Sequence, residues 1–175
     1  MNSKILAILA VGCCIAIPGY TQSNTMSAAD KKFVHSAAEG GMAEVQLGQL
    51  AEQKASSQDV KDFGHRMVSD HSQANDKLKS LASNKGITLP SSVNAKDKAL
   101  YDRLSALSGS EFDRAYMNAM VKDHTTDVSE FQKESNTAKD QDLREFASMT
   151  LPTLKDHLRM AQDVDHKLGS SASRQ

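Results

Sequence analysis

The chain has 175 residues, of which 25% are charged and 39% hydrophobic, so it suits one globular domain and is too apolar to be disordered. Aromatic residues make up only 5% and tryptophan is absent, which favours helix-on-helix packing over a β-sandwich. The formal net charge of -1, without a basic stripe, argues against a nucleic-acid binder and against a protein held on anionic lipids by charge.

The N-terminal segment has the pattern of a secretory signal peptide. Lys4 precedes an apolar run over 5–17, and turn-forming polar residues follow it. The run is shorter than the roughly 20 residues that span a bilayer, so we expect residues 1–22 to be cleaved and the mature chain to have no membrane span. Cleavage would remove both cysteines and release a periplasmic protein without thiols. Attachment to lipid through Cys13 is the alternative, although the run stays apolar after that residue.

Beyond this segment, apolar residues recur at steps of three and four, the spacing of a helix with one buried face. The spacing predicts long helices over 28–54, 58–85, 109–136 and 141–168, and a short amphipathic helix near 100–107. Ser27 and Asp30 have the form of a capping box before the first helix, and residues 84–86 have the form of a C-cap after the second. The polar residues 169–175 predict a flexible tail.

The lengths of the connections predict the topology. Breaks of a few residues after the first and third long helices make each pair antiparallel neighbours. The roughly 24 residues between the two pairs can run the length of a helix, which is about 40 Å at 1.5 Å per residue. We therefore expect an all-α, ferritin-like four-helix bundle over 28–168, in which one long crossover contains the short helix. A connection that only bridges one end of the bundle is the alternative.

Each long helix has a polar residue on its apolar face; these residues are Glu44, His71, His124 and His157. Counted along the helices at 1.5 Å per residue, all four lie roughly 17–22 Å from the same end of the bundle. One carboxylate and three imidazoles at one level can hold a transition-metal ion such as Fe, Zn, Cu or Mn.

An aspartate directly precedes each of these histidines. We expect Asp70, Asp123 and Asp156 to accept hydrogen bonds from the ring nitrogens that do not bind the metal, from their own helix or the next. A second interpretation of the same polar residues stays open, in which they form a buried hydrogen-bonded network that sets the packing of the helices and binds nothing.

Motifs of catalysis are absent after residue 22. The sequence has no serine–histidine–aspartate triad, no glycine-rich phosphate loop and no Cys-x-x-Cys motif there, so an enzyme is the weakest alternative. The sequence predicts either a metal-binding protein or a non-enzymatic structural protein of the cell envelope. Its expected partners are other envelope components or a second copy of the chain.

Four segments, 39–48, 63–71, 120–124 and 150–158, resemble in order an uncharacterised bacterial family of exported proteins with a domain of unknown function, often labelled outer membrane proteins. The resemblance implies a ferritin-like helical bundle and no established activity. Di-iron ferritin-like proteins carry Glu-x-x-His on two helices. Here the residues three before the histidines are Val68, Val121 and Leu154, so di-iron chemistry does not follow from the fold.

Overall fold

The structure, a computed structural model, describes residues 26–172. This range forms five helices and no strand: α1 (Ala28–Lys54), α2 (Gln58–Asn84), α3 (Ala95–Ser105), α4 (Gly109–Thr137) and α5 (Gln141–Ala172). The all-α class expected from the sequence is confirmed. None of these five helices is long and apolar enough to cross a membrane. The expected signal peptide, residues 1–22, lies outside the described residues together with both cysteines.

Side-chain caps fix where helices begin. The Ser27 hydroxyl accepts a hydrogen bond from the Asp30 amide, and the Asp30 carboxylate accepts one from the Ser27 amide, each at 3.1 Å, which completes the expected capping box. Asn94 caps α3 by accepting from the Asp97 amide, and Asp140 caps α5. Each cap supplies an acceptor to a backbone amide that has no partner inside its helix.

The end of α5 differs from the sequence-based expectation. The spacing predicts an end near 168 and a flexible tail over 169–175, whereas α5 continues to Ala172. Gly169 costs about 1 kcal/mol in a helix relative to alanine, which the hydrogen bonds of one more turn can offset. The Ser170 hydroxyl donates to the Lys167 carbonyl at 2.9 Å and supports that turn.

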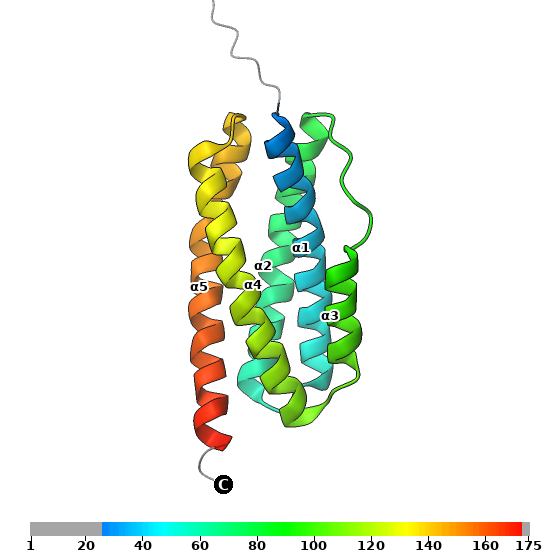
Figure 1. The fold of residues 1–175 in the computed structure, drawn as a ribbon, viewed down its shortest axis with the longest axis vertical. Helices are drawn as coiled ribbons and strands as arrows, with labels where there is room; N and C mark the ends of the chain where they lie inside the picture. Colours follow the sequence, from blue (N-terminus) through cyan, green and yellow to red (C-terminus); the bar gives the residue numbers. More distant parts are fainter. Residues whose placement is uncertain (1–25, 173–175) are drawn as a thin grey trace, which may run out of the picture.

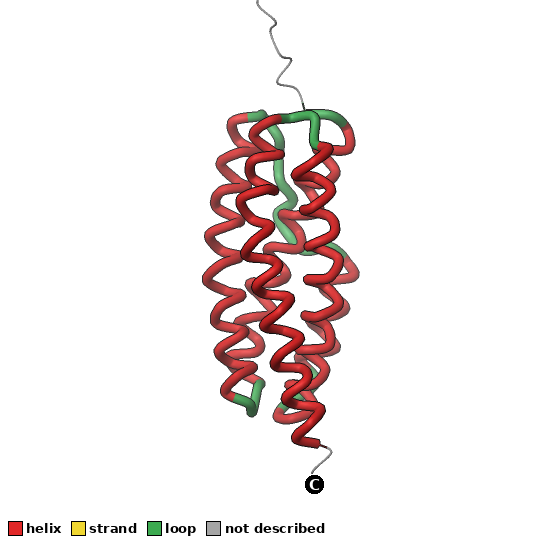
Figure 2. The backbone as a smooth tube through the Cα atoms, turned by 90° about the vertical axis from the view of Figure 1, so that its left-hand side faces the viewer, coloured by secondary structure: helices red, strands yellow, loops and turns green. Residues whose placement is uncertain are grey.

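The long connection between α2 and α4 crosses the bundle from one end to the other, as the sequence predicts. Figure 1 shows α1 descending and α2 rising, after which the chain runs down the outside of the bundle through α3. α4 then rises from the lower end and α5 descends beside it. Figure 2 shows the loop before α3 lying along the bundle. Because α1 and α5 each contact both α2 and α4, neighbouring long helices are antiparallel, as in bundles with one long crossover connection.

The apolar core has two halves, separated at mid-height by buried polar residues. On α4, for example, Met120 belongs to the half near the α1–α2 loop and Phe131 belongs to the half near the α4–α5 loop. Each long helix buries one polar residue between the two halves; these residues are Glu44, His71, His124 and His157. The predicted common level of the four residues is therefore confirmed as a single polar layer.

Buried aspartates fasten the loops at both ends of the bundle. At one end, Asp30 of α1 accepts hydrogen bonds from the backbone amides of Lys139 and Asp140, in the α4–α5 loop, at 3.1–3.2 Å. At the other end, Asp113 of α4 accepts from two backbone amides of the α1–α2 loop, at 2.9 and 3.1 Å. Hydrogen bonds to a charged acceptor contribute about 1.5–3 kcal/mol each, so the two aspartates tie the two helical hairpins together.

α1 and α2 pack backbone against backbone at a pair of glycines. A β-carbon added to Gly48 would lie 2.6 Å from the Gly64 carbonyl oxygen, and one added to Gly64 would lie 2.8 Å from the Gly48 oxygen. Two helix backbones can approach this closely only where neither carries a side chain. A β-carbon added to Gly40, two turns earlier in α1, has no other atom within 4 Å.

Alanine at Gly48 and alanine at Gly40 should therefore have opposite effects on stability. We expect Gly48→Ala to lower the free energy of unfolding by about 1–3 kcal/mol, because the two backbones must separate. Gly40→Ala adds a methyl group in open space and improves helix propensity, so it should raise that free energy by up to about 1 kcal/mol. Urea unfolding followed by circular dichroism measures both values. A Gly48→Ala protein as stable as Gly40→Ala would contradict the close approach of α1 and α2.

Candidate metal centre

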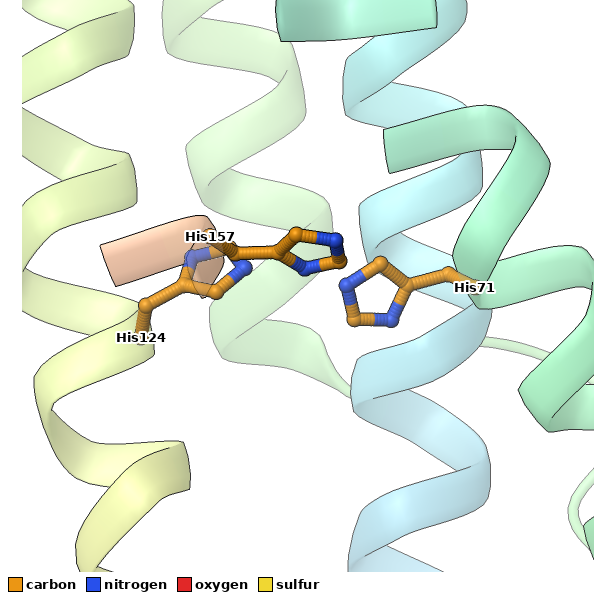
Figure 3. Close-up of side chains that lie close together, drawn as sticks. All are labelled: His71, His124 and His157. Atoms are coloured by element: carbon orange, nitrogen blue, oxygen red, sulfur yellow. The ribbon is translucent and has the colours of Figure 1, made fainter. Parts of the chain in front are cut away.

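Three histidines from three helices meet in the polar layer. His71 lies on α2, His124 on α4 and His157 on α5, and their exposed fractions are 7%, 0% and 1%. Their ring centroids are 5.3–5.8 Å apart, and one possible ligand nitrogen of each ring lies within 4.8 Å of the other two. Figure 3 shows the rings turned toward one another, with a nitrogen of each facing the space between them. These three residues are called the histidine cluster below.

Two of the rings are fixed by hydrogen bonds on their outer nitrogens. His157 Nε2 lies 2.9 Å from a carboxylate oxygen of Asp70 on α2. His124 Nδ1 lies 3.0 Å from the Met120 carbonyl oxygen, one turn earlier on α4. A carbonyl and a carboxylate only accept, so these two nitrogens donate and carry the protons of the neutral rings.

The inner nitrogens of His157 and His124 keep their lone pairs. His157 Nδ1 and His124 Nε2 are the nitrogens left unprotonated by the outer hydrogen bonds, and neither has a hydrogen-bond partner among residues 26–172. His71 Nε2 is buried and unpartnered in the same way. The cluster thus presents one unpaired ring nitrogen from each of three helices.

Burial keeps the rings neutral. Loss of hydration, and then the neighbouring rings, lower the pKa of His71 to about 3 and the pKa of His124 to about 4. Burial also lowers the pKa of His157, against the hydrogen bond to Asp70, which raises it. A neutral imidazole with a free lone pair is the form that binds metal ions.

Asp70 holds His157 from the neighbouring helix. Burial raises the pKa of Asp70, but the hydrogen bonds from His157 and Arg66 outweigh this effect, and the pKa falls below its ordinary value. The Arg66 guanidinium binds the same carboxylate from one turn earlier in α2. Asp70 is therefore ionised at neutral pH and fixes both the orientation and the protonated nitrogen of His157, as carboxylates beside metal-binding histidines do.

Glu44 belongs to a different group of side chains. In the described part of the chain, the histidine cluster is the one set of three or more histidine, cysteine or carboxylate side chains whose ligand atoms all lie within 4.8 Å of one another. Glu44 is 1% exposed, and burial raises its pKa well above the ordinary value, as does the negative charge of Asp123. The raised pKa favours the protonated form of Glu44, and neither of its carboxyl oxygens has a hydrogen-bond partner among residues 26–172.

Two further aspartates lie near this pair. Burial, and then the charge of Asp123, raise the pKa of Asp97 on α3 and raise that of Asp127 on α4 to about 8. Glu44, Asp97, Asp123 and Asp127 form what we call the carboxyl cluster, where α1, α3 and α4 contact one another. Sequence reasoning missed Asp97 and Asp127. Asp127 follows His124 by three residues, a spacing that could have drawn attention to it, but no pattern predicted where α3 would pack.

Of the three aspartates predicted to hold histidines, Asp70 alone forms that hydrogen bond within residues 26–172. Asp123 interacts with Glu44, and the Asp156 side chain is 67% exposed and lies 3.9 Å from Arg159. Successive residues on a helix point about 100° apart, so the aspartate before a buried histidine points to the flank of its helix. It reaches a histidine only where a neighbouring helix brings one to that flank.

Comparison with known families identifies the chain by sequence. Residues 17–164 match the family model described as a domain of unknown function, DUF4142. The chain belongs to this family. The resemblance to a family of unknown function, based above on four short segments, is thereby confirmed. No curated protein matches the DUF4142 chain.

Solved structures of two DUF305 proteins share the fold of this DUF4142 chain. One is a fragment from Deinococcus radiodurans, with a TM-score of 0.72, and the other is designated a candidate secreted protein from Streptomyces coelicolor, with a TM-score of 0.69. The alignments cover 82% and 83% of this chain and 99% and 95% of those chains, at 11% sequence identity in both cases. At this identity the likeness shows the fold alone.

The histidine cluster and Glu44 should affect the pH dependence of stability with opposite signs. In metal-free protein, unfolding returns His124 from a pKa of about 4 to its ordinary value near 6.5. The unfolded chain then binds a proton that the folded chain does not, so this group makes stability rise with pH between 5 and 6. Because burial raises the pKa of Glu44 well above its ordinary value, the folded chain holds this proton more tightly than the unfolded chain, so this group makes stability fall with pH over the same range.

We therefore expect His124→Leu to lower the slope of unfolding free energy against pH by about 1 kcal/mol per pH unit, and Glu44→Gln to raise it by about the same amount. Urea unfolding of EDTA-treated protein at pH 5 and pH 6 measures the slopes. Slopes that move in the same direction in the two variants would show that one of these groups is not held in the charge state described.

Proposed function

We propose that this protein is an exported, non-enzymatic metal-binding bundle in which His71, His124 and His157 hold one divalent transition-metal ion. The main support is the set of three buried ring nitrogens that face the same space without a hydrogen-bond partner in the described range. A buried polar atom left unpaired costs about 1–3 kcal/mol. A purely structural network would use these nitrogens in hydrogen bonds, whereas this arrangement leaves them available to a ligand.

The spacing of the nitrogens suits one small ion. Nitrogens bound to zinc at about 2.0–2.1 Å in tetrahedral geometry lie roughly 3.4 Å apart. Those of the histidine cluster lie within 4.8 Å of one another. Each pair therefore has to close by at most about 1.4 Å for all three nitrogens to bind one ion. Three protein ligands leave a fourth position for water or a further ligand.

Ligand chemistry narrows the choice of metal. Neutral imidazoles suit Zn, Cu, Fe and Ni, whereas Mn prefers oxygen ligands. Glu44, which the sequence suggested as a fourth ligand, lies outside the set, and its raised pKa favours the protonated form. Of the four metals suggested by the sequence, we therefore favour Zn, Cu or Fe over Mn.

Export agrees with a role in storing or buffering a metal, or in protecting against its redox chemistry. The first 22 residues have the pattern of a signal peptide, and the similar protein from Streptomyces coelicolor is designated a candidate secreted protein. In the periplasm, a site buried inside a bundle would keep a metal ion away from other molecules.

A structural protein of the envelope is the second candidate. It is favoured by the outer hydrogen bonds of the cluster, because the pair of His157 and Asp70 joins α5 to α2 without any ligand. Under this function, substitution of the histidines changes stability and leaves the protein with no metal affinity to lose.

Metal titration separates the two candidates. For protein purified without a polyhistidine tag, we expect one Zn²⁺ or Cu²⁺ per chain by elemental analysis and calorimetry. His71→Ala/His124→Ala should bind about a hundredfold or more weakly, because two of three ligands are lost. His65→Ala is the matched control, since His65 is 80% exposed and pairs with Glu52, and it should bind as the wild type does.

Stability measurements provide an independent readout of the same titration. Metal at a hundred times its dissociation constant should raise the free energy of unfolding of the wild type by about 2.7 kcal/mol and leave that of the double variant unchanged. Wild-type stoichiometry in the double variant, or no binding by the wild type, would rule out the histidine cluster as the metal site.

Asp70 should contribute to metal affinity through His157. We expect Asp70→Asn to weaken binding about 10–100-fold, because a neutral amide orients and polarises the ring less than a carboxylate. Asp156→Asn removes an equal charge directly before His157, at an exposed position, and should bind like the wild type. Calorimetry gives both dissociation constants, and equal values in the two variants would argue that Asp70 does not position the ligand.

A further inference from the structure

A small cavity leads from His71 toward the flank of the bundle. It has a volume of about 40 Å³ and is lined by residues of all four long helices. Its ionisable lining residues are His71, Asp127 and Glu130. His71 is one of the buried residues with an unpartnered nitrogen in the described range, so the cavity borders a residue of the histidine cluster that carries a free ligand atom.

The cavity adjoins a groove of about 300 Å³ between the first turns of α1 and the last turns of α4. The two share Phe33, Ser36 and Glu130 in their linings. α3 packs against α1 and α4 in the other half of the bundle, as Figure 1 shows. The side of the bundle between α1 and α4 is thus covered near the α1–α2 loop and grooved near the opposite end.

The charged residues that line the groove differ from those that line the cavity. Three lysines lie beside three carboxylates in the groove, whereas the cavity has two carboxylates and no lysine or arginine in its lining. Burial and the nearby carboxylates, against the opposite effect of Lys96, raise the pKa of Asp127 to about 8. Lys96 offsets only part of this effect, so an incoming cation would add positive charge beside the Asp127 carboxyl group.

We propose that metal ions reach the histidine cluster through this cavity, with Glu130 and then Asp127 as transient oxygen ligands before His71. This inference rests on the proposed function. It adds the route by which the metal ion enters and the state in which it enters, as an ion that carries only water. A cavity of about 40 Å³ has room for a few water molecules at about 10–15 Å³ each, and therefore for an ion with a few of its waters. It excludes an ion wrapped in an organic chelator.

Gly40 allows the path to be blocked with little disturbance of the fold. It lines the cavity, and a β-carbon added there meets no other atom within 4 Å. Leucine adds three more carbon atoms at the lining of the cavity than alanine does, so we expect leucine to narrow the path and alanine to leave it largely open.

The test is the rate of Co²⁺ uptake by metal-free protein, followed by absorbance in a stopped-flow instrument. We expect Gly40→Leu to slow uptake by about tenfold or more while one Co²⁺ still binds at equilibrium, and Gly40→Ala to stay close to the wild-type rate. Asp127→Asn/Glu130→Gln should slow uptake by about tenfold or more and weaken its dependence on ionic strength. Asp62→Asn/Glu111→Gln removes two charges at exposed positions and is the matched control.

Rates and equilibria separate this inference from the proposed function. Uptake at the wild-type rate in Asp127→Asn/Glu130→Gln, or in a folded Gly40→Leu protein, would overturn the route, and stoichiometric Co²⁺ binding in the same samples would leave the proposed function standing. Wild-type protein that takes up no Co²⁺ at equilibrium would overturn both. Circular dichroism and urea unfolding show whether Gly40→Leu is folded. If it is not folded, the uptake rate of Asp127→Asn/Glu130→Gln alone tests the route.

Discussion

The histidine cluster imposes the strictest physical constraint on this bundle. Three buried nitrogens must face one another at mid-height without hydrogen-bond partners in the described range, an arrangement that costs free energy until a ligand meets them. Interactions elsewhere in the fold offset this free-energy cost. Apolar residues fill the core on both sides of the polar layer, and Asp30 and Asp113 fasten the two ends. Because stability comes from outside the layer, the layer itself can remain unsatisfied.

Burial shifts the pKa values of the two polar clusters of the same layer in opposite directions. It lowers the pKa values of His71 and His124 and raises the pKa of Glu44, and both shifts favour the neutral form of the side chain. A neutral imidazole is ready to bind a metal ion, whereas a protonated carboxyl group must first lose its proton. The imidazoles are therefore the stronger ligands of the layer at neutral pH, and the carboxyl groups respond to a cation only when it comes close.

Spacing along the sequence predicts which residues are buried and at what height, but not which of them become neighbours. The first helix is predicted over 28–54 and observed over Ala28–Lys54, because its cap and its apolar steps are local signals. The common level of Glu44 and the three histidines follows from the helical rise alone. The rotation of each helix about its axis does not, and this rotation decides that Glu44 interacts with Asp123 while His157 meets Asp70.

Contacts between distant residues leave no periodic pattern to find. Asp30 accepts from the backbone of Lys139, 109 residues later, and it reads in the sequence only as a capping residue. The carboxyl cluster depends on where α3 docks, which the length of the crossover permits but does not specify. For the same reason, the number of histidines at the site could be predicted from the sequence, whereas the side from which a ligand enters could not.

The crossover explains why the site has a closed side and an open one. A plain up-and-down bundle of helices of these lengths would also bring the histidines to one level, so the crossover is not needed to assemble the cluster. The crossover carries the chain along the outside of the bundle. It places α3 against α1 and α4, where α3 covers one half of the length over which α1 and α4 contact each other. The other half keeps the groove that adjoins the cavity at His71. If α3 instead covered the full length of that contact, the unpaired nitrogens would be sealed inside the core, and their cost would have no compensating ligand.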